Sequence, residues 1–297
     1  MGTSAAAGLT LGSAIRLGRV SNLPTVWTNV LAGAVLSGTM PRAGQILGLM
    51  LALSLFYVAG MYLNDAFDAK YDRLHRPSRP IPSGSVSITA VFSMGGALLA
   101  AGLALLLVLT ATGSNTSTLS LAFGLGLAAL IVIYDAWHKG NPVGPVLMGA
   151  CRLLVYLIAS ASIAGTVPVE ARWAALVCLC YVIGLTYAAK QEDLLRPGSL
   201  WPLVVLAAPL VYAMPAALRW GYATIFYAGL LAVIIYAVAQ LVRFGKARVS
   251  TVVTVLIAGI CLLDAVLIAS AGEPALATIA AIGFVLTLLL QRIVPGT

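Results

Sequence analysis

Charged residues are scarce in this sequence, and acidic ones are the scarcest. Only nine Asp and Glu occur among 297 residues, and all charged residues together make up 9% of the chain. Soluble domains carry about a quarter of their residues as charges, so this composition excludes a soluble globular protein. The four cysteines lie in apolar segments without the pairing of a metal site, and we interpret them as small core residues rather than disulfides or ligands.

Apolar residues take the place of the missing charge. Hydrophobic residues make up 61% of the chain, and its mean hydropathy is +1.02. These values predict an all-α polytopic membrane protein that lies in a lipid bilayer. The net charge of +8 could suggest a nucleic-acid partner. We exclude nucleic acid because the basic residues are spread over short loops between apolar segments. No obligate protein partner is indicated either.

The apolar segments are each close to the ~20 residues that a helix needs to cross a bilayer. The segment near 200–218 is the least certain, because three prolines interrupt the apolar run between 200 and 243. We therefore expect a bundle of nine or ten membrane helices. No charge-rich linker divides the chain, so residues 1–297 are expected to form one transmembrane domain. The ten candidate spans are residues 20–40, 45–64, 86–110, 117–134, 143–165, 172–189, 200–218, 221–242, 250–271 and 275–291.

The distribution of basic residues predicts the orientation of these spans. If the N-terminus is cytoplasmic, thirteen basic residues fall in cytoplasmic segments and only Arg42, Arg172 and Arg219 fall outside. This asymmetry follows the positive-inside rule. It predicts a multi-pass protein, in the inner membrane if the cell is bacterial, with its polar loops on the cytoplasmic side. Six of the nine acidic residues then lie on that side too: Asp65, Asp68, Asp72, Asp135, Glu192 and Asp193.

A row of carboxylates follows directly on the second apolar segment. Asn64, Asp65, Asp68 and Asp72 recur at intervals that place them on one face if the helix continues for two more turns. Such a row of like charges is destabilising alone, and divalent cations would relieve it. Mg²⁺ is usually held by one or two carboxylates, water and substrate phosphates. The row therefore predicts a magnesium site for a diphosphate.

Basic residues and prolines come next along the chain. Arg73, His75, Arg76 and Arg79 offer donors suited to phosphate oxygens, and three prolines between 77 and 82 stop the helix. The alternative interpretation is a solvated cytoplasmic loop. That alternative explains the arginines but not the aspartates at helical spacing.

The stretch from Asn64 to Gly84 resembles the first aspartate-rich motif of the UbiA superfamily of intramembrane prenyltransferases. It reads Asn-Asp-x-x-Asp-x-x-x-Asp and then Arg-Pro-x-Arg-Pro-Ile-Pro-Ser-Gly. The resemblance implies a UbiA-like bundle, usually of nine spans, that transfers an isoprenyl group from a prenyl diphosphate to an acceptor with Mg²⁺. It makes Asp65 and Asp68 catalytic metal ligands, with Asn64 and Asp72 as further ligands and Arg76 and Arg79 as substrate contacts.

The loop after the fourth span is similar to a second element of that family, a Tyr followed a few residues later by a Lys. Here Tyr134 is followed by Lys139 and Asn141. The resemblance makes Lys139 a candidate to neutralise the leaving group, and Tyr134 and Asn141 candidate substrate contacts. Spacing alone leaves Lys139 equally well explained as a positive-inside residue.

Two charges lie inside apolar segments. Arg152 follows Met-Gly-Ala-Cys in the fifth span. An arginine at such a depth costs on the order of 2.5–3.5 kcal/mol on insertion scales. We therefore expect Arg152 to face a polar cavity or a partner, and we assign it a catalytic role. The alternative is that its side chain snorkels to the interface. Asp264 lies in the middle of a late span and should face the bundle interior, as an acceptor contact or, slightly favoured, a helix–helix hydrogen bond.

The end of the sixth span departs from the family pattern. The second Asp-x-x-x-Asp motif expected after Tyr187 is absent, and Lys190, Glu192 and Asp193 stand there instead. We expect Tyr187, Lys190 and Glu192 to contact the substrate and Glu192 to reach a second Mg²⁺. These features resemble a divergent branch of UbiA-like proteins found with the Ebo gene clusters.

The sequence thus predicts a Mg²⁺-dependent prenyltransferase whose acceptor is unknown. An intramembrane terpene cyclase shares the ionisation step but needs no acceptor. A lipid or isoprenoid transporter is disfavoured, because a row of aspartates at one interface serves no transport pathway and the sequence shows no clear repeat. A CDP-alcohol phosphotransferase is disfavoured because its Asp-Gly-x-x-Ala-Arg motif is missing.

Overall fold

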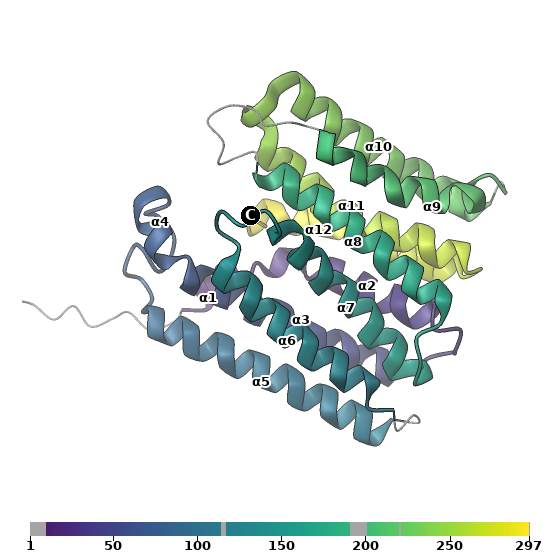
Figure 1. Ribbon diagram of the computed structural model, residues 1–297, viewed down its shortest axis with the longest axis horizontal. Coiled ribbons are helices and arrows are strands. Elements are labelled where there is room, and N and C mark those ends of the chain that lie inside the picture. Colours follow the sequence, from purple (N-terminus) through teal and green to yellow (C-terminus); the bar gives the residue numbers. More distant parts are fainter. Residues whose placement is uncertain (1–9, 114–116, 191–200, 220, 297) are drawn as a thin grey trace, which may run out of the picture.

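Helices account for nearly all of the chain. The computed structural model describes residues 10–113, 117–190, 201–219 and 221–296. Consecutive long helices run in opposite directions between the two ends of an elongated bundle (Figure 1). The helices, in chain order, are α1 (Leu11–Leu17), α2 (Leu23–Val35), α3 (Ala43–Phe67), α4 (Ala69–His75), α5 (Ile88–Thr112), α6 (Leu119–Trp137), α7 (Gly144–Ala164), α8 (Val169–Lys190), α9 (Ala207–Ala217), α10 (Tyr222–Phe244), α11 (Val249–Ser270) and α12 (Pro274–Ile293). Short 3₁₀ turns, Val20–Asn22, Trp201–Leu206 and Gly245–Arg248, precede α2, α9 and α11.

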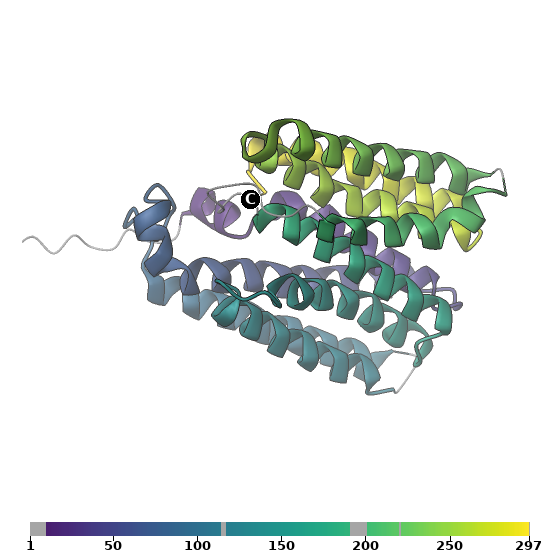
Figure 2. The same ribbon diagram turned by 45° about the horizontal axis from the view of Figure 1, so that its top comes forward.

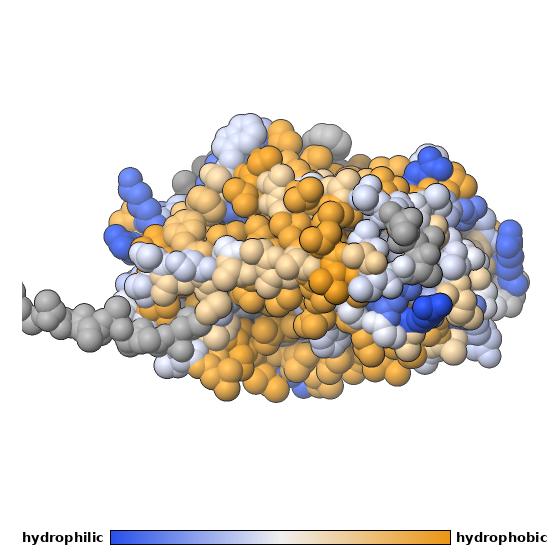
Figure 3. All heavy atoms as spheres, turned by 90° about the horizontal axis from the view of Figure 1, so that it is seen from below, coloured by the Kyte–Doolittle hydropathy of each residue, from blue (hydrophilic) through white to orange (hydrophobic). Residues whose placement is uncertain are grey.

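The expected membrane bundle is confirmed. Eight helices in the described ranges are long and apolar enough to cross a membrane: α3, α5, α6, α7, α8, α10, α11 and α12. The other two predicted spans hold shorter helices. Residues 20–40 contain the 13-residue α2, and residues 200–218 contain a 3₁₀ turn and then α9, with Pro215 inside that helix. Large apolar side chains cover much of the outer face in Figure 3, and hydrophilic ones gather toward its ends, as a bilayer requires.

Two apolar cores meet at α2 and α7. One core joins α2, α3, α5, α6 and α7. The other joins α2 and α7 to α8 through α12, and Figure 2 shows α2 between the two groups of helices. Among the eight candidate membrane helices of the described ranges, α11 has the largest buried share, 72% of its most apolar stretch. The bundle is therefore organised around two inner helices, α2 and α11, that pack against each other.

Small residues let the inner helices approach closely, as is common in membrane bundles. A Cβ atom on Gly33 of α2 would lie 2.7 Å from the backbone oxygen of Tyr156 on α7. Only glycine fits there, because that oxygen belongs to a helix backbone and cannot turn aside. The close contact holds α7, which carries Arg152, against α2.

Candidate active site

The carboxylate row lies where α3 passes into α4, at one end of the bundle. The backbone N–H of Asp68 donates to the oxygen of Asn64, and that of Asp72 donates to Asp68, both at 2.9 Å. Helical hydrogen bonds therefore continue across the junction, and Asn64, Asp65, Asp68 and Asp72 share one face, as their spacing predicted. All four side chains are buried.

Two arginines compensate the charge of this row. Nη1 of Arg79 lies 3.2 Å from Oδ1 of Asp65 and 2.7 Å from Oδ2 of Asp72. Nη2 of Arg19 lies 3.2 Å from the same oxygen of Asp65. Arg79 was predicted as a site residue, and the turns that follow α4 return it to the row. Arg19 was used only to predict the orientation of the membrane spans. Its backbone is left-handed, between α1 and α2, and its side chain reaches Asp65.

The loop between α6 and α7 supplies the cations for the middle of the row. Nζ of Lys139 lies 3.1 Å, and Nε2 of His138 3.5 Å, from Oδ2 of Asp68. Burial raises the pKa of Asp68, but the hydrogen bond from His138 and the charges of His138 and Lys139 outweigh it and lower the pKa below its ordinary value. Lys139 also lies over the ring of Tyr71 at 3.8 Å. Lys139 thus stands beside the row, where a leaving diphosphate would need it.

Other predicted residues lie around this centre. Tyr134 stacks on His138 with ring centroids 4.9 Å apart. Nζ of Lys190, at the end of α8, donates to the backbone oxygen of Asn141 at 2.6 Å, and Oδ1 of Asn141 accepts from the backbone of Val143. The structure thus pairs Lys190 with Asn141 rather than with the row.

Four other residues singled out in the sequence differ in exposure. Arg76 and Tyr187 are partly buried, whereas Arg73 and His75 are exposed, and His75 stacks on Tyr71. Glu192 lies outside the described residues.

Arg152 is held deeper in the bundle, where α2 and α7 meet. Its guanidinium donates to Oδ1 of Asn29 at 3.0 Å and to the hydroxyl of Thr25 at 3.1 Å. Nδ2 of Asn29 in turn donates to the carboxylate of Asp264, which also accepts from the hydroxyl of Tyr156. Arg152 therefore has polar partners, as predicted, and Asp264 makes the helix–helix hydrogen bonds that were slightly favoured for it. The sequence could have indicated this network, because Thr25 and Asn29 are polar residues within an otherwise apolar segment.

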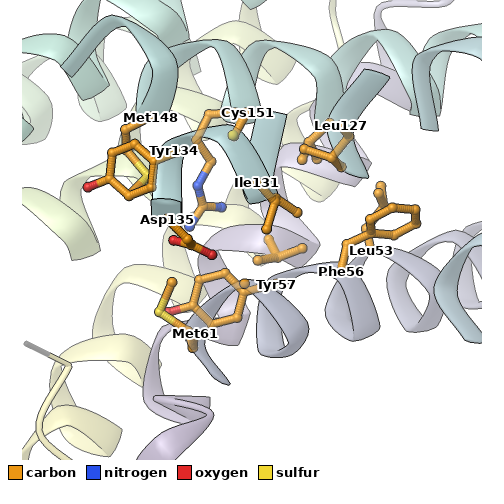
Figure 4. A pocket seen from close by; sticks show the side chains of 14 residues that line it. Leu53, Phe56, Tyr57, Met61, Leu127, Ile131, Tyr134, Asp135, Met148 and Cys151 are labelled. Atoms are coloured by element: carbon orange, nitrogen blue, oxygen red, sulfur yellow. The ribbon is translucent and has the colours of Figure 1, made fainter. Parts of the chain in front are cut away.

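An apolar pocket opens between α2, α3, α6 and α7. In Figure 4, Asp135 lies at one end of it near Tyr57, Tyr134 and Met61, and Leu53, Phe56 and Leu127 lie at the other. Arg152 and Cys151 complete its polar lining. Its mostly apolar lining suits a hydrocarbon group.

A second cavity, which is basic, borders Asp65 of the row. Its lining includes Arg16, Arg19, Asp65, Arg79 and the hydroxyls of Ser83 and Ser85. Its donors suit phosphate oxygens. Asp65 of the row thus lines the basic cavity, and Asn64 of the row donates to Asp135, which lines the apolar pocket.

The donors of the row fit a hard divalent cation. Oxygen ligands are what Mg²⁺ prefers, and Oδ1 of Asp72 is buried without a hydrogen-bond partner among the described residues. Within that same part of the chain, no three His, Cys, Asp or Glu side chains already stand in a metal-binding arrangement. Arg19, Arg79 and Lys139 form ion pairs with the carboxylate oxygens instead. Nδ2 of Asn64 donates to Oδ1 of Asp135 at 3.2 Å.

The fold and the site define a multi-pass integral membrane protein with a charged site at one end of a helical bundle. The chain belongs to the UbiA prenyltransferase family, whose sequence profile matches residues 25–246. This confirms the family that the motif indicated, and with it the expected class of enzyme, a prenyltransferase.

Named relatives agree with this assignment. A digeranylgeranylglyceryl phosphate synthase from Methanoregula boonei is 30% identical over 56% of this chain and 54% of its own length. One from Methanopyrus kandleri is 26% identical over 71% of this chain and 73% of its own. The chain thus spans about half the length of the first relative.

Solved structures show the same fold. A UbiA homologue from Aeropyrum pernix K1 superimposes with a TM-score of 0.64 at 19% identity, over 88% of this chain and 96% of the other. A digeranylgeranylglyceryl phosphate synthase gives 0.62 at 20% identity, over 88% and 98%.

Proposed function

We propose that this protein transfers an isoprenyl group from a prenyl diphosphate to an acceptor, with Mg²⁺ as cofactor. The observation that carries the proposal is the buried carboxylate row, which borders a basic cavity through Asp65 and contacts the lining of an apolar pocket through Asn64. A prenyl diphosphate has these two parts, a doubly phosphorylated head and a hydrocarbon tail. The row lies where the bond between them must break.

The head group binds at the row and the basic cavity. Asp65, Asp68 and Asp72 would hold Mg²⁺, which neutralises charge that develops on the departing diphosphate. Arg19 and Arg79 line the cavity and supply donors for phosphate oxygens, and Lys139 does so from the other side of Asp68. Arg76 is the further arginine of the same loop. Glu192 is proposed as a ligand for a second metal.

The apolar pocket takes the hydrocarbon tail. Most of its lining is aliphatic or aromatic, so it excludes water around the reacting carbon and limits hydrolysis. Tyr134 and Arg152, which line it, are proposed to contact the substrates. The relatives are named for a product with geranylgeranyl groups on glyceryl phosphate, so a prenylated glyceryl phosphate is the first acceptor to test.

The whole chain, residues 1–297, is proposed to act as one domain, with the row facing the cytoplasm. The basic residues of α1, of the turns after α4 and of the loops that follow α6 and α10 lie at the row's end of the bundle (Figure 1).

Asp65→Asn and Asp68→Asn test the proposal. Purified protein is incubated with Mg²⁺ and prenyl diphosphates of several lengths, with and without lipid extract, and products are read by mass spectrometry. We expect each substitution to lower turnover by about a hundredfold or more while the protein stays folded. Glu170→Gln, an exposed carboxylate at the start of α8, is the matched control and should change nothing. Near-normal Mg²⁺-dependent turnover in both aspartate variants contradicts the proposal. Product formed from prenyl diphosphate alone identifies a cyclase.

A further inference from the structure

One carboxylate of the site has no assigned task. Asp135, in the last turn of α6, is 4% exposed. Its Oδ1 accepts from Nδ2 of Asn64 at 3.2 Å. Its Oδ2 is buried and has no hydrogen-bond partner among the described residues. A buried acceptor left unpaired is destabilising, so such an oxygen marks a place for a donor.

The free oxygen belongs to a residue that lines the apolar pocket. Asp135 lies at the polar end of this pocket, near Tyr57 and Tyr134 (Figure 4). The bond from Asn64 ties it to the carboxylate row. Asp135 is therefore placed where the diphosphate site meets the hydrocarbon site, which is where the reacting carbon of a prenyl diphosphate must lie.

A nucleophile has to come within about 3–3.5 Å of that carbon. An acceptor alcohol brings a hydroxyl group, and a hydroxyl donates a hydrogen bond that a carboxylate oxygen accepts. We propose that Oδ2 of Asp135 binds the hydroxyl of the acceptor and that Asn64 orients this carboxylate. The acceptor class is thus an alcohol: its oxygen bonds to the prenyl carbon as the carbon–diphosphate bond breaks, the released diphosphate takes up the hydroxyl proton, and the product is an ether. This inference rests on the proposed prenyl transfer for its biological meaning.

The geometry predicts how the site discriminates between ligands. An ether has no hydroxyl proton, so it leaves Oδ2 unpaired and binds less tightly. In Asp135→Asn, the carbonyl oxygen of the new amide faces Asn64 and its NH₂ group faces the pocket. An NH₂ group donates equally well to an alcohol oxygen and to an ether oxygen, so the discrimination disappears.

The test compares geranylgeraniol with geranylgeranyl methyl ether as probes of the full chain in nanodiscs. Binding is read as protection of Cys151, a pocket residue, from N-ethylmaleimide, with the partly exposed Cys180 as internal reference. We expect wild type to bind the alcohol at least about tenfold more tightly than the ether, and Asp135→Asn to bind the two within about twofold. Ser120→Ala, a buried polar change in the first turn of α6, should keep the wild-type ratio.

If Asp135→Asn does not fold, Asn64→Ala is tested in its place. It keeps the carboxylate but removes the bond that orients it, and should lower the ratio by a smaller factor. Equal binding of both probes by wild type, binding of neither, or an unchanged ratio in Asp135→Asn overturns the inference. An unchanged ratio with a raised Mg²⁺ requirement for turnover would make Asp135 a metal ligand instead. Binding is measured without prenyl diphosphate, so a chain that discriminates the probes but transfers no prenyl group refutes the proposed function alone.

Discussion

Nδ2 of Asn29 lies 2.8 and 3.0 Å from the two carboxylate oxygens of Asp264. Because this nitrogen faces a carboxylate, the other end of the amide, Oδ1, faces the guanidinium of Arg152. The carboxylate on α11 and the cation on α7 are thus joined through a neutral amide on α2. The arrangement gives each charge a partner inside the bundle, which is how buried charges are tolerated.

Asp264→Asn should destabilise the protein. The NH₂ group of the new amide then replaces an oxygen that accepts from the NH₂ group of Asn29, and a buried donor left unpaired costs roughly 1–3 kcal/mol. Thermal unfolding in detergent would measure the loss. The control is Cys261→Ser, a change of similar size that is also buried on α11. An Asp264→Asn protein as stable as this control would show that the amide–carboxylate pair contributes little.

Arg79→Gln should lower turnover of prenyl diphosphate by at least about tenfold, because it removes a phosphate donor and leaves Asp65 and Asp72 without their shared cation. Arg79→Lys should recover only part of the activity, since an ammonium group keeps the charge but lacks the planar guanidinium whose Nη1 contacts both carboxylates. Steady-state kinetics on the variants would measure both effects. Arg73→Gln changes an exposed arginine of α4 and should stay within about twofold of wild type. Equal losses from Arg73→Gln and Arg79→Gln would mean that only the net charge of the loop matters.

The two ends of α5 should lie on opposite sides of the membrane. Ser78, in the loop before α5, and Thr112, at its last turn, are both exposed. With one cysteine introduced at a time in a background without native cysteines, Thr112→Cys should react with an impermeant thiol reagent added to intact cells. Ser78→Cys should react only after the cells are opened. Reaction of Ser78→Cys in intact cells would reverse the proposed orientation.

Gly33→Ala should destabilise the bundle, because its new Cβ would lie 2.7 Å from the backbone oxygen of Tyr156 and force α2 away from α7. We expect a loss of about 1–3 kcal/mol, typical of overpacking. Gly126→Ala on α6 is the matched control, since its Cβ would meet only Leu154 at an ordinary 3.7 Å. The unfolding midpoints of Gly33→Ala and Gly126→Ala, each compared with wild type, measure this loss. Similar midpoints would show that α2 and α7 can separate at little cost.

Glu192→Gln should raise the Mg²⁺ concentration needed for turnover or abolish it, whereas Asp193→Asn should be milder. The expectation follows from the missing second aspartate motif, which leaves Glu192 as the proposed ligand there. A Mg²⁺ titration of activity in wild type and both variants measures it. If both substitutions have the same negligible effect, the end of α8 takes no part in the diphosphate site.

The carboxylate row was predictable because it depends on local spacing. Four residues spaced three or four positions apart in one helix share a face, whatever the helix packs against. The family motif contains the same four residues. The partners of the row were harder to foresee. Arg19 reaches Asp65 across 46 positions in sequence, through a left-handed turn that no periodicity reveals.

Polar contacts between distant segments escaped prediction for the same reason. Lys190 was expected at the phosphate, yet it donates to the backbone of Asn141, on a loop that only tertiary packing brings near. The positions of the membrane helices followed from hydropathy. The short length of α2 did not, because the apolar run continues past Val35, where the helix ends.

The central place of α2 constrains how the protein is made. Asn29 of α2 emerges from the ribosome 235 residues before Asp264, its partner on α11. At about 5–20 residues per second, that interval lasts roughly 10–50 seconds. During it, the polar side of a 13-residue helix has neither its carboxylate nor the later helices that bury it, and hydrocarbon is a costly environment for such a surface. Newly inserted α2 therefore depends on its surroundings, a lipid interface or an assisting protein, until α11 arrives.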